Sequence, residues 1–582
     1  MKLSSLISNG MVFQRNKENI IWGKECAPGA KITVSIAPFC PDACSTSLCR
    51  ESTYAKEDGT FEITFADIPE GGPYVLTVCE MEGCTVTYEE VYCGDVFLLA
   101  GQSNMEIPLA RCLDMYEDEI RQLNLPYIHY FEVAKEFGFG EPTEDIYSGK
   151  WIPALQENLY PMSALGVFFA RLLHEDENVH VGLIQTGVGG THIESYLSEE
   201  RVLKVGELLK QEAQKRGENI STCNCDKNNS CKVCYQKRIE QNKDALWVSR
   251  TLSEEMKAQQ DWCEDLERID TGKEQHWEKR ESLYDNVCDK KYTCVPGLWE
   301  NQDEEHKELE SLRGSAWVLK RFEVPDEWLD KEVRLYMGTL VDSDETYVNG
   351  TLVGTTGYRY PPRRYRIPAG ILHKGENTIV IRIVANARSG GFVPESPYLL
   401  SLEGNIMRRD ITAGIKDGSI ISLEGQWEYR IGANKHSSLC ESIEEMHDVT
   451  FFTWQPTAMY NRMIYPVRNM HFKGILFYQG ESNVTHAWEY EYLMVEMAEC
   501  LREVLGEQLP MGFVQLPMFG GEDDLRGTST WDDLRASQKR AATKIPNCVL
   551  ADIYDLGFKY ELHPQTKKEA AQRLYELMKK IM

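Results

Sequence analysis

The chain has 582 residues, of which 42% are hydrophobic and 26% charged, and a formal net charge of −28. It is too long for one hydrophobic core, so we expect about three to five structural units. The negative field repels phosphate backbones, which argues against a nucleic-acid partner. No apolar run reaches the roughly 18 to 20 residues of a membrane span, and residues 1–10 are too short in apolar content for a secretion signal. The 18 cysteines are scattered, which favours reduced thiols and a cytoplasmic protein over a disulfide framework.

Residues 1–90 carry short β-branched runs, such as residues 31–36, separated by turn signals such as Pro28-Gly29. This pattern predicts a small β-sandwich. From residue 91 to 195 the pattern changes to strands that alternate with helices, including a helix over residues 163–173, and this alternation is typical of an α/β sheet.

The strand expected at residues 95–100 ends in Gly101-Gln102-Ser103-Asn104. Glycine permits a sharp backbone turn that a residue with a β-carbon resists. A hydroxyl at the end of a rigid strand is placed as a nucleophile must be placed. The alternative is that Ser103 only caps the next helical turn.

A second buried strand, "HVGLIQTGVGG", runs into a glycine-rich turn that contains Gly187, Gly189 and Gly190. Such a turn at the edge of an α/β sheet can bring backbone N–H groups close to a reacting oxygen. It can equally be a tight turn without a ligand. A phosphate loop is not indicated, because no Gly-Lys-Ser/Thr follows.

Residues 196–310 are polar, helical in pattern and dense in charge. They contain Cys223-x-Cys225 and Cys231-x-x-Cys234, four thiols close enough to hold zinc. Only one residue separates Cys223 from Cys225, which is a shorter spacing than is usual in zinc sites. We therefore favour a loop with free thiols and predict no metal.

Residues 311–430 alternate as β-strands do, and Asn349-Gly350 is a strong hairpin signal. We therefore predict a second β-sandwich inserted in the α/β domain. The α/β pattern resumes over residues 431–582, where a strand ends in Gln479-Gly480-Glu481-Ser482-Asn483 and a helix is expected over residues 487–505. The last helix places Ala570, Ala571 and Leu574 on one buried face.

A serine nucleophile needs a base, and His563 lies in a loop between a strand and the last helix. Residues two apart share a face of an extended segment, so Glu561 can lie beside His563 and fix its tautomer. The alternative for His563 is an exposed histidine at a helix start, and His192 and His486 are the other candidate bases.

Four blocks of the sequence, "GDVFLLAGQSNM", "GLIQTGVGGTHIE", "ILFYQGESN" and "ELHP", resemble in order and spacing those of the SGNH hydrolases, and most closely the sialate O-acetylesterase branch. The resemblance implies a flavodoxin-like, three-layer α/β SGNH hydrolase domain formed by residues 91–195 and 431–582. It also implies an N-terminal β-sandwich (1–90) and an inserted jelly-roll β domain (311–430) similar to the sugar-binding domain of certain β-glycosidases. The helical insertion (196–310) has no counterpart in the family.

The resemblance implies that Ser103 is the nucleophile and His563 the base, with Ser482 in a supporting role. The oxyanion hole would comprise the Ser103 N–H, an N–H of Gly189 or Gly190, and a side-chain amide of the third block. Both Gln479 and Asn483 offer that amide, and we favour Gln479. The family commonly has aspartate where this chain has Glu561, so the third member of the triad stays open, with Asp552, Asp555 and a Ser–His dyad as alternatives.

The implied activity is a cofactor-free serine esterase that removes acetyl groups from sugar hydroxyls. O-acetylated sialic acid is the favoured substrate, followed by acetylated xylan fragments. The sialate carboxylate would need a cation, and the jelly-roll region offers Arg359, Arg363, Arg364 and Arg388. Two rival functions are a carbohydrate-binding protein with a decayed esterase site and a glycoside hydrolase, which would need two opposed carboxylates. A homo-oligomer is compatible with the sequence.

Overall fold

The computed structural model describes residues 1–582 except 41–46, 147, 216–231, 280–289, 302–306, 387–388, 403–413, 417, 445–450, 507, 521–524 and 527–528. The chain forms two compact units. The first comprises Met1–Cys112, Glu119–Ala245 and Phe451–Met582, and the second comprises Leu113–Asp118 and Leu246–Thr450. Within the described residues, no helix is both long and apolar enough to cross a membrane.

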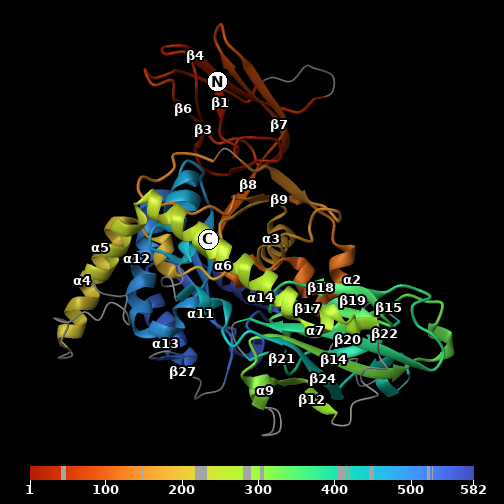
Figure 1. The fold of residues 1–582 in the computed structure, drawn as a ribbon. Helices are drawn as coiled ribbons and strands as arrows, with labels where there is room; N and C mark the ends of the chain where they lie inside the picture. Colours follow the sequence, from red (N-terminus) through yellow and green to blue (C-terminus); the bar gives the residue numbers. More distant parts are fainter. Residues whose placement is uncertain are drawn as a thin grey trace. The chain divides into compact units, whose positions relative to one another are not determined.

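The first unit is built on a mixed sheet of eleven strands (Figure 1). Its main path runs in the order β10 (Trp151–Ala154), β9 (Leu125–Glu132), β11 (His180–Gln185), β8 (Thr85–Gly101), β25 (Gly474–Tyr478), β26 (Met511–Val514) and β29 (Cys548–Ala551). All neighbours on this path are parallel except β10 and β9. The strands from β9 to β26 are almost continuously buried, as expected for parallel strands covered on both faces.

Strand β8 is unusually long and continues from the N-terminal β region into the centre of this sheet. Its first half pairs with β7 (Gly71–Glu80), and its second half pairs with β11 and β25. The other N-terminal strands are β1 (Lys2–Leu3), β2 (Val12–Gln14), β3 (Asn19–Lys24), β4 (Lys31–Pro38), β5 (Cys49–Tyr54) and β6 (Phe61–Phe65). β1, β3 and β6 form a small sheet of their own, whereas β2, β4, β5 and β7 join the large one.

Two groups of helices belong to the first unit. α3 (Ala164–Glu177) and α14 (Lys567–Met578) pack against one another, α3 on β9 and β11, and α14 on β26 and β29. α12 (Ala487–Leu505) packs on α13 (Trp531–Ala542) and on α4 (Glu199–Lys215), and α4 in turn contacts α5 (Lys232–Asn242). The helix expected over residues 487–505 is confirmed, and α3 begins at the expected place because Ser163 Oγ accepts a hydrogen bond from the Gly166 N–H (3.1 Å).

The second unit consists mainly of antiparallel sheets. One runs in the order β12 (Lys291–Val295), β24 (Gly425–Asn434), β14 (Gly314–Glu323), β20 (Glu376–Ala385), β17 (Ser343–Val348) and β18 (Thr351–Thr356). A second comprises β19 (Arg364–Ile367), β15 (Val333–Met337), β22 (Tyr398–Ser401) and β23 (Ile420–Ser422), and a small third comprises β13 (Gly297–Leu298), β21 (Gly391–Phe392) and β16 (Leu340–Val341). Buried residues of all three sheets form one hydrophobic core. The expected hairpin is confirmed, since Asn349-Gly350 joins β17 to β18.

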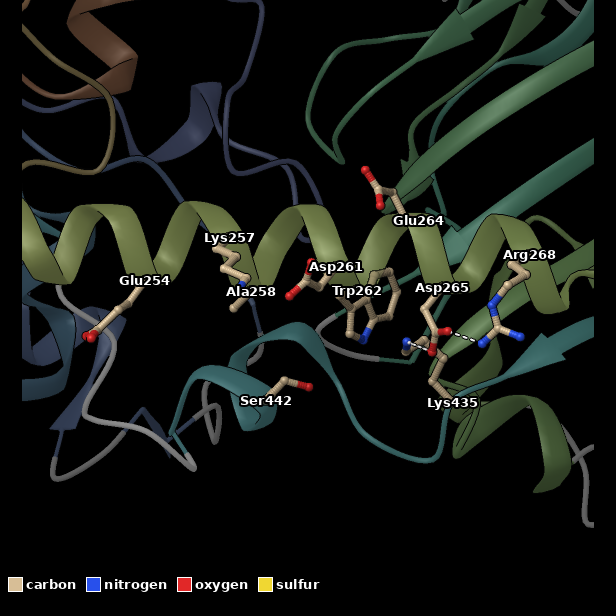
Figure 2. A pocket seen from close by; sticks show the side chains of 10 residues that line it. All are labelled: Glu254, Lys257, Ala258, Asp261, Trp262, Glu264, Asp265, Arg268, Lys435 and Ser442. Carbon is tan, nitrogen blue, oxygen red and sulfur yellow. Dashed lines mark hydrogen bonds and ion pairs between the residues drawn. The ribbon is translucent and has the colours of Figure 1, made fainter.

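The helices of the second unit include α6 (Ala245–Ile269), α7 (Thr271–Glu274), α9 (Lys307–Glu310) and α11 (Leu439–Glu444). A cavity of about 910 Å³ is lined by residues of α6 and α11 and by Lys435 (Figure 2). Its lining charges largely compensate one another, because Asp265 is bound by both Lys435 and Arg268. No histidine or cysteine lines it, so its chemistry favours a structural groove over a catalytic one.

The units differ in extent from the segments expected from the sequence. The expected boundary at residues 90 and 91 falls inside β8, because this one strand pairs first with the N-terminal strands and then with the α/β strands of the same sheet. The expected helical insertion is divided, since α4 and α5 belong to the first unit whereas α6 and the strand β12 belong to the second. β24 extends to Asn434, so the second unit continues past residue 430.

Candidate active site

Three neighbouring parallel strands of the first unit end at the same edge of the sheet. β11, β8 and β25 end at Gln185, Gly101 and Tyr478, and each is followed by one of the segments singled out in the sequence. Ligands of open α/β sheets bind at the carboxyl ends of parallel strands. The strand order therefore brings the two Gly-x-Ser-Asn segments and the glycine turn together.

Gly101 lets the chain turn abruptly at the end of β8. Its φ is +128°, and a β-carbon there would lie 2.1 Å from the carbonyl oxygen of Tyr478 on the adjacent strand. Only glycine fits this close approach. The short helix α1 (Ser103–Glu106) begins two residues later, so Ser103 occupies its first position.

Ser103 and His563 lie side by side although 460 residues separate them. The distance between Ser103 Oγ and His563 Nε2 is 2.8 Å, which is that of a hydrogen bond. Both side chains are half-buried, so a substrate can reach the hydroxyl while its base stays ordered. A hydroxyl in contact with an imidazole is the arrangement that activates a serine for attack.

The carboxylates proposed to support His563 have different surroundings. Glu561 is half-buried, and its backbone N–H donates to the Phe558 carbonyl (3.4 Å). Asp555 forms a two-fold ion pair with Arg573 (2.6 and 2.7 Å), and Asp552 is bound by Arg535 (3.2 Å). Arg573 holds the pKa of Asp555 at about 2. Hydrogen bonds from the Tyr554 N–H and from Lys539, together with the charge of Arg535, lower the pKa of Asp552 against the effect of burial. Both aspartates thus already form ion pairs with arginines.

The glycine turn contacts both Gly-x-Ser-Asn segments. The Gly189 N–H donates to Glu106 Oε2 (2.7 Å), and a β-carbon on Gly189 would lie 3.7 Å from that of Ser103. The Gly190 carbonyl accepts a hydrogen bond from Ser482 Oγ (2.8 Å). Gly189 therefore lies beside Ser103, but Glu106 already binds its N–H group.

The two amides predicted for the oxyanion hole belong to a buried network. Gln479 Nε2 lies within 3.1 Å of three acceptors, Gln102 Oε1, the Thr191 carbonyl and Asn483 Oδ1. Asn483 Nδ2 donates to Glu194 Oε2 (2.9 Å), and Tyr235 of α5 reaches the other oxygen of Glu194 (3.4 Å). Gln479 has only two N–H bonds for three acceptors. Both amides thus hold the loops together in this structure.

Gln102 is a site residue that the sequence reasoning missed. Its Oε1 accepts hydrogen bonds from the backbone N–H groups of Gly480 (3.4 Å) and Ser482 (3.2 Å), which fixes the orientation of the amide. Among the described residues, no acceptor is assigned to Gln102 Nε2, to the Ser103 N–H or to the Gly190 N–H. The signal was present in the sequence, since Gln102 is an amide that directly precedes Ser103.

The other candidate bases are engaged elsewhere. His192 is half-buried, its ring lies 5.2 Å from that of Trp454, and a hydrogen bond links it to the Ser482 backbone. Burial lowers the pKa of His192, so it is neutral and structural. His486 Nδ1 lies 2.9 Å from Thr485 Oγ1. Cys223, Cys225 and Cys231 lie outside the described residues, and Cys234 is described only as part of α5.

Residues 93–222 and 448–580 match the family described as carbohydrate esterase, sialic acid-specific acetylesterase. Curated relatives include the sialate O-acetylesterases of Mus musculus (27% identical, 35% of this chain and 38% of that protein) and Homo sapiens (26% identical, 36% and 41%). The matched region thus spans about two fifths of these relatives. The crystal structure of a carbohydrate acetylesterase from Xanthomonas citri is similar over 100% of this chain and 75% of that one, with a TM-score of 0.52 and 18% identity. The resemblance to the sialate O-acetylesterase family is therefore confirmed, and the solved structure supports the mixed α/β fold.

Proposed function

We propose that this chain, similar to the sialate O-acetylesterases over its two α/β segments, is a serine esterase that removes O-acetyl groups from sugars. The observation that carries the proposal is the 2.8 Å contact between Ser103 Oγ and His563 Nε2 at the carboxyl edge of the parallel sheet. The family match spans both residues, which supports the acetylated carbohydrate as substrate.

The reaction proceeds in two halves through an acetyl-enzyme. Ser103 Oγ attacks the acetyl carbonyl carbon while its proton moves to His563 Nε2. The tetrahedral intermediate collapses, the bond to the sugar oxygen breaks, and that oxygen takes the proton from His563. Water then attacks the acetyl group on Ser103, giving its proton to His563, and acetate leaves as the proton returns to Ser103 Oγ.

We assign the oxyanion hole to the Ser103 N–H, the Gly190 N–H and the Gln102 Nε2 amide. These donors belong to the segment of Ser103 and to the glycine turn, and no acceptor is assigned to them among the described residues, whereas the Gly189 N–H and Gln479 are already engaged. Hydrogen-bond donors that are fixed in place before the reaction stabilise a developing oxyanion. Removal of one such donor typically raises the activation barrier by about 3 to 4 kcal/mol. This assignment replaces the amide of the third block that we favoured from the sequence.

We assign the third position of the triad to Glu561. Asp552 and Asp555 are already held in ion pairs with arginines. The remaining candidate carboxylate is Glu561, two residues before His563. A carboxylate there would hold the imidazole in the tautomer that accepts the Ser103 proton and would stabilise the imidazolium that forms.

We favour O-acetylated sialic acid as substrate, with acetylated xylo-oligosaccharides second. Of the arginines considered from the sequence, Arg363 is fully buried against Asp344, Arg364 pairs with Asp114, and Arg388 lies outside the described residues. Lys135 is also paired, with Glu106 and Glu132, but Glu106 binds the Gly189 N–H and so places this lysine beside the glycine turn. Lys135 is therefore the cation that we expect to bind a sugar carboxylate.

An aromatic surface beside the glycine turn supports a sugar as the alcohol part of the substrate. A β-carbon on Gly190 would lie 2.6 Å from the Trp454 indole nitrogen, so Trp454 packs directly on the turn. Phe451 stacks on Trp454 with ring centroids 4.0 Å apart and is 48% exposed. Exposed aromatic rings provide flat apolar area on which the C–H face of a pyranose can stack.

We further infer that the first unit has the SGNH hydrolase layout and that the second is a jelly roll. The parallel order of β9, β11, β8, β25, β26 and β29, with α3 and α14 packed together, supports the former. The antiparallel sheets around one core support the latter. A purely carbohydrate-binding role is the alternative, and it predicts no turnover of any acetyl ester.

The proposal is tested by trapping the acetyl-enzyme. Protein quenched in acid during turnover of 4-nitrophenyl acetate should carry one acetyl group on the peptide that contains Ser103, as read by mass spectrometry. Acetylation of another residue, or none while nitrophenol is released, would contradict it. Acetate release from O-acetylated sialic acid and acetylated xylo-oligosaccharides then ranks the substrates, and Lys135→Met should raise KM for the first alone.

A further inference from the structure

A buried lysine lies directly behind the Ser103–His563 pair. Lys567 is the first residue of α14 and is 1% exposed. Its Nζ donates to Asn104 Oδ1 (2.7 Å) and to the Pro564 carbonyl (2.8 Å). Lysine is almost never fully buried without a partner or a function, because removing the ammonium from water is costly.

Asn104 extends the contact to the other side of His563. Its Nδ2 donates to the Leu562 carbonyl (3.0 Å) and to a carboxylate oxygen of Glu481. The carbonyls of the two residues that flank His563 are therefore held by Asn104 and Lys567. Since Asn104 directly follows Ser103, the same pair of side chains ties the nucleophile to the base.

Four ionisable groups influence or adjoin this lysine. Glu481, Glu561 and the Cys112 thiol act on it electrostatically, and the Tyr478 ring lies 5.4 Å from Nζ. Burial lowers the pKa of Lys567 to about 8, so it carries its charge at neutral pH and below. Glu481 is half-buried, and burial raises its pKa while the hydrogen bond from Asn104 and the charge of Lys567 lower it.

We propose that Lys567 and Asn104 position His563 against Ser103, and that the charge of Lys567 keeps the imidazole deprotonated, and so able to act as base, near neutral pH. The proposal rests on the roles given to Ser103 and His563 above. Lys567 and Asn104 are positioning residues, since they act through His563 and the reacting atoms do not touch them.

The sign of the effect follows from the charges. A cation disfavours the imidazolium form of a neighbouring histidine and so lowers its pKa. The acid limb of the kcat/KM profile reports the pKa of the free base. Removing the ammonium must therefore move that limb to higher pH. A lysine with only a structural role would change the amount of active enzyme and leave the limb where it is.

The test uses Lys567→Met, which keeps the length of the side chain and removes its charge and donors. Lys568→Met is the matched control, because Lys568 is the next residue along α14, is exposed and pairs with Glu119. We expect Lys567→Met to lower kcat for 4-nitrophenyl acetate by roughly 10- to 100-fold through misplacement of His563. We also expect its acid limb to rise by roughly half to one pH unit. The control should retain both values.

Lys567→Gln separates the two parts of the proposal and replaces Lys567→Met if that variant does not fold. Glutamine can donate to Asn104 but carries no charge, so it should lose less kcat yet show the same shift of the limb. An unchanged limb in both variants would overturn the role of the charge, and an unchanged kcat would overturn the positioning.

Titration of His563 itself distinguishes failure of this inference from failure of the proposed function. Protein labelled at histidine ¹³Cε1 gives one NMR signal for each of the 12 histidines, and His563→Gln identifies the relevant one. The pKa of His563 should rise in Lys567→Met whether or not the chain is an esterase. No change in that pKa would overturn the inference even in an active enzyme.

Discussion

The two Gly-x-Ser-Asn segments, residues 101–104 and 480–483, are nearly identical in sequence and occupy equivalent places. They follow β8 and β25, adjacent parallel strands on which Gly101 pairs with Tyr478. Gly101 and Gly480 both have positive φ, at +128° and +151°. Yet Ser103 Oγ contacts His563, whereas Ser482 Oγ donates to the Gly190 carbonyl.

The two serines differ in the other segment of the chain that each side chain contacts. The loop before α14 brings an imidazole to the first, and the glycine turn brings only a carbonyl to the second. The residue between glycine and serine also differs, since Gln102 joins the two segments and Glu481 pairs with Asn104. Whether a hydroxyl at a strand end contacts an imidazole thus depends on its neighbours in the fold, and four residues of sequence do not decide it.

The largest effect should come from Ser103→Ala, which removes the attacking oxygen. We expect kcat for acetyl esters to fall by roughly 10⁴- to 10⁶-fold, as in other serine hydrolases that lose the nucleophile. The measurement is steady-state hydrolysis of 4-nitrophenyl acetate, with thermal unfolding to show that the variant folds. If Ser482→Ala proved the more damaging of the two, the assignment of the serines would have to be exchanged.

Gln102→Glu should have the next largest effect. It preserves an acceptor for the amides of Gly480 and Ser482 but replaces the Nε2 donor with an oxygen. We expect kcat to fall by about 10²- to 10³-fold, the usual loss for one oxyanion donor. Gln479→Met is the comparison, and it should lower the melting temperature more than kcat. If Gln479→Met instead lowered kcat more than the melting temperature, the oxyanion donor would be Gln479.

Alanine at the two glycines should distinguish the strand ends by stability. At Gly101 a β-carbon meets the Tyr478 backbone oxygen at 2.1 Å, whereas at Gly480 it meets a Leu534 side-chain methyl at 2.6 Å. A side chain can move and a paired strand cannot. We expect Gly101→Ala to cost more than about 3 kcal/mol of unfolding free energy and Gly480→Ala about 1 to 3 kcal/mol. Urea unfolding measures both, and equal costs would contradict this reasoning.

The smallest effect should come from Ser482→Ala. It removes one buried hydrogen bond to Gly190, worth about 1 kcal/mol of stability. Activity should fall only a few-fold, through a looser glycine turn, and KM for nitrophenyl acetate should stay near its wild-type value. Kinetics and chemical denaturation on the same preparation would check both values, and a loss of activity comparable to that of Ser103→Ala would refute a supporting role.

Local patterns predicted the strand ends well, because a buried strand that stops at glycine is a short-range feature. The contact between Ser103 and His563 was also expected, through the resemblance to a family. The oxyanion amide and the roles of Asn104 and Lys567 depend on side-chain partners far apart in the chain. One signal was nevertheless available for Lys567, since it lies three and four residues before Ala570 and Ala571 on the buried face of α14. A lysine on an apolar helix face indicates a buried partner or a function.

β8 has a consequence for how the first unit unfolds. Its 17 residues pair with β7 and β2 near one end and with β11 and β25 near the other. Because one strand carries both sets of pairings, neither set can separate without exposing backbone next to the other. Amide protons of Val96 to Leu99 should therefore exchange with solvent only through global opening of this unit, N-terminal β region included. The N-terminal region is in this sense a cooperative part of the first unit, and a chain that begins at residue 91 would lack β2 and β7, which pair with β8 up to Gly94.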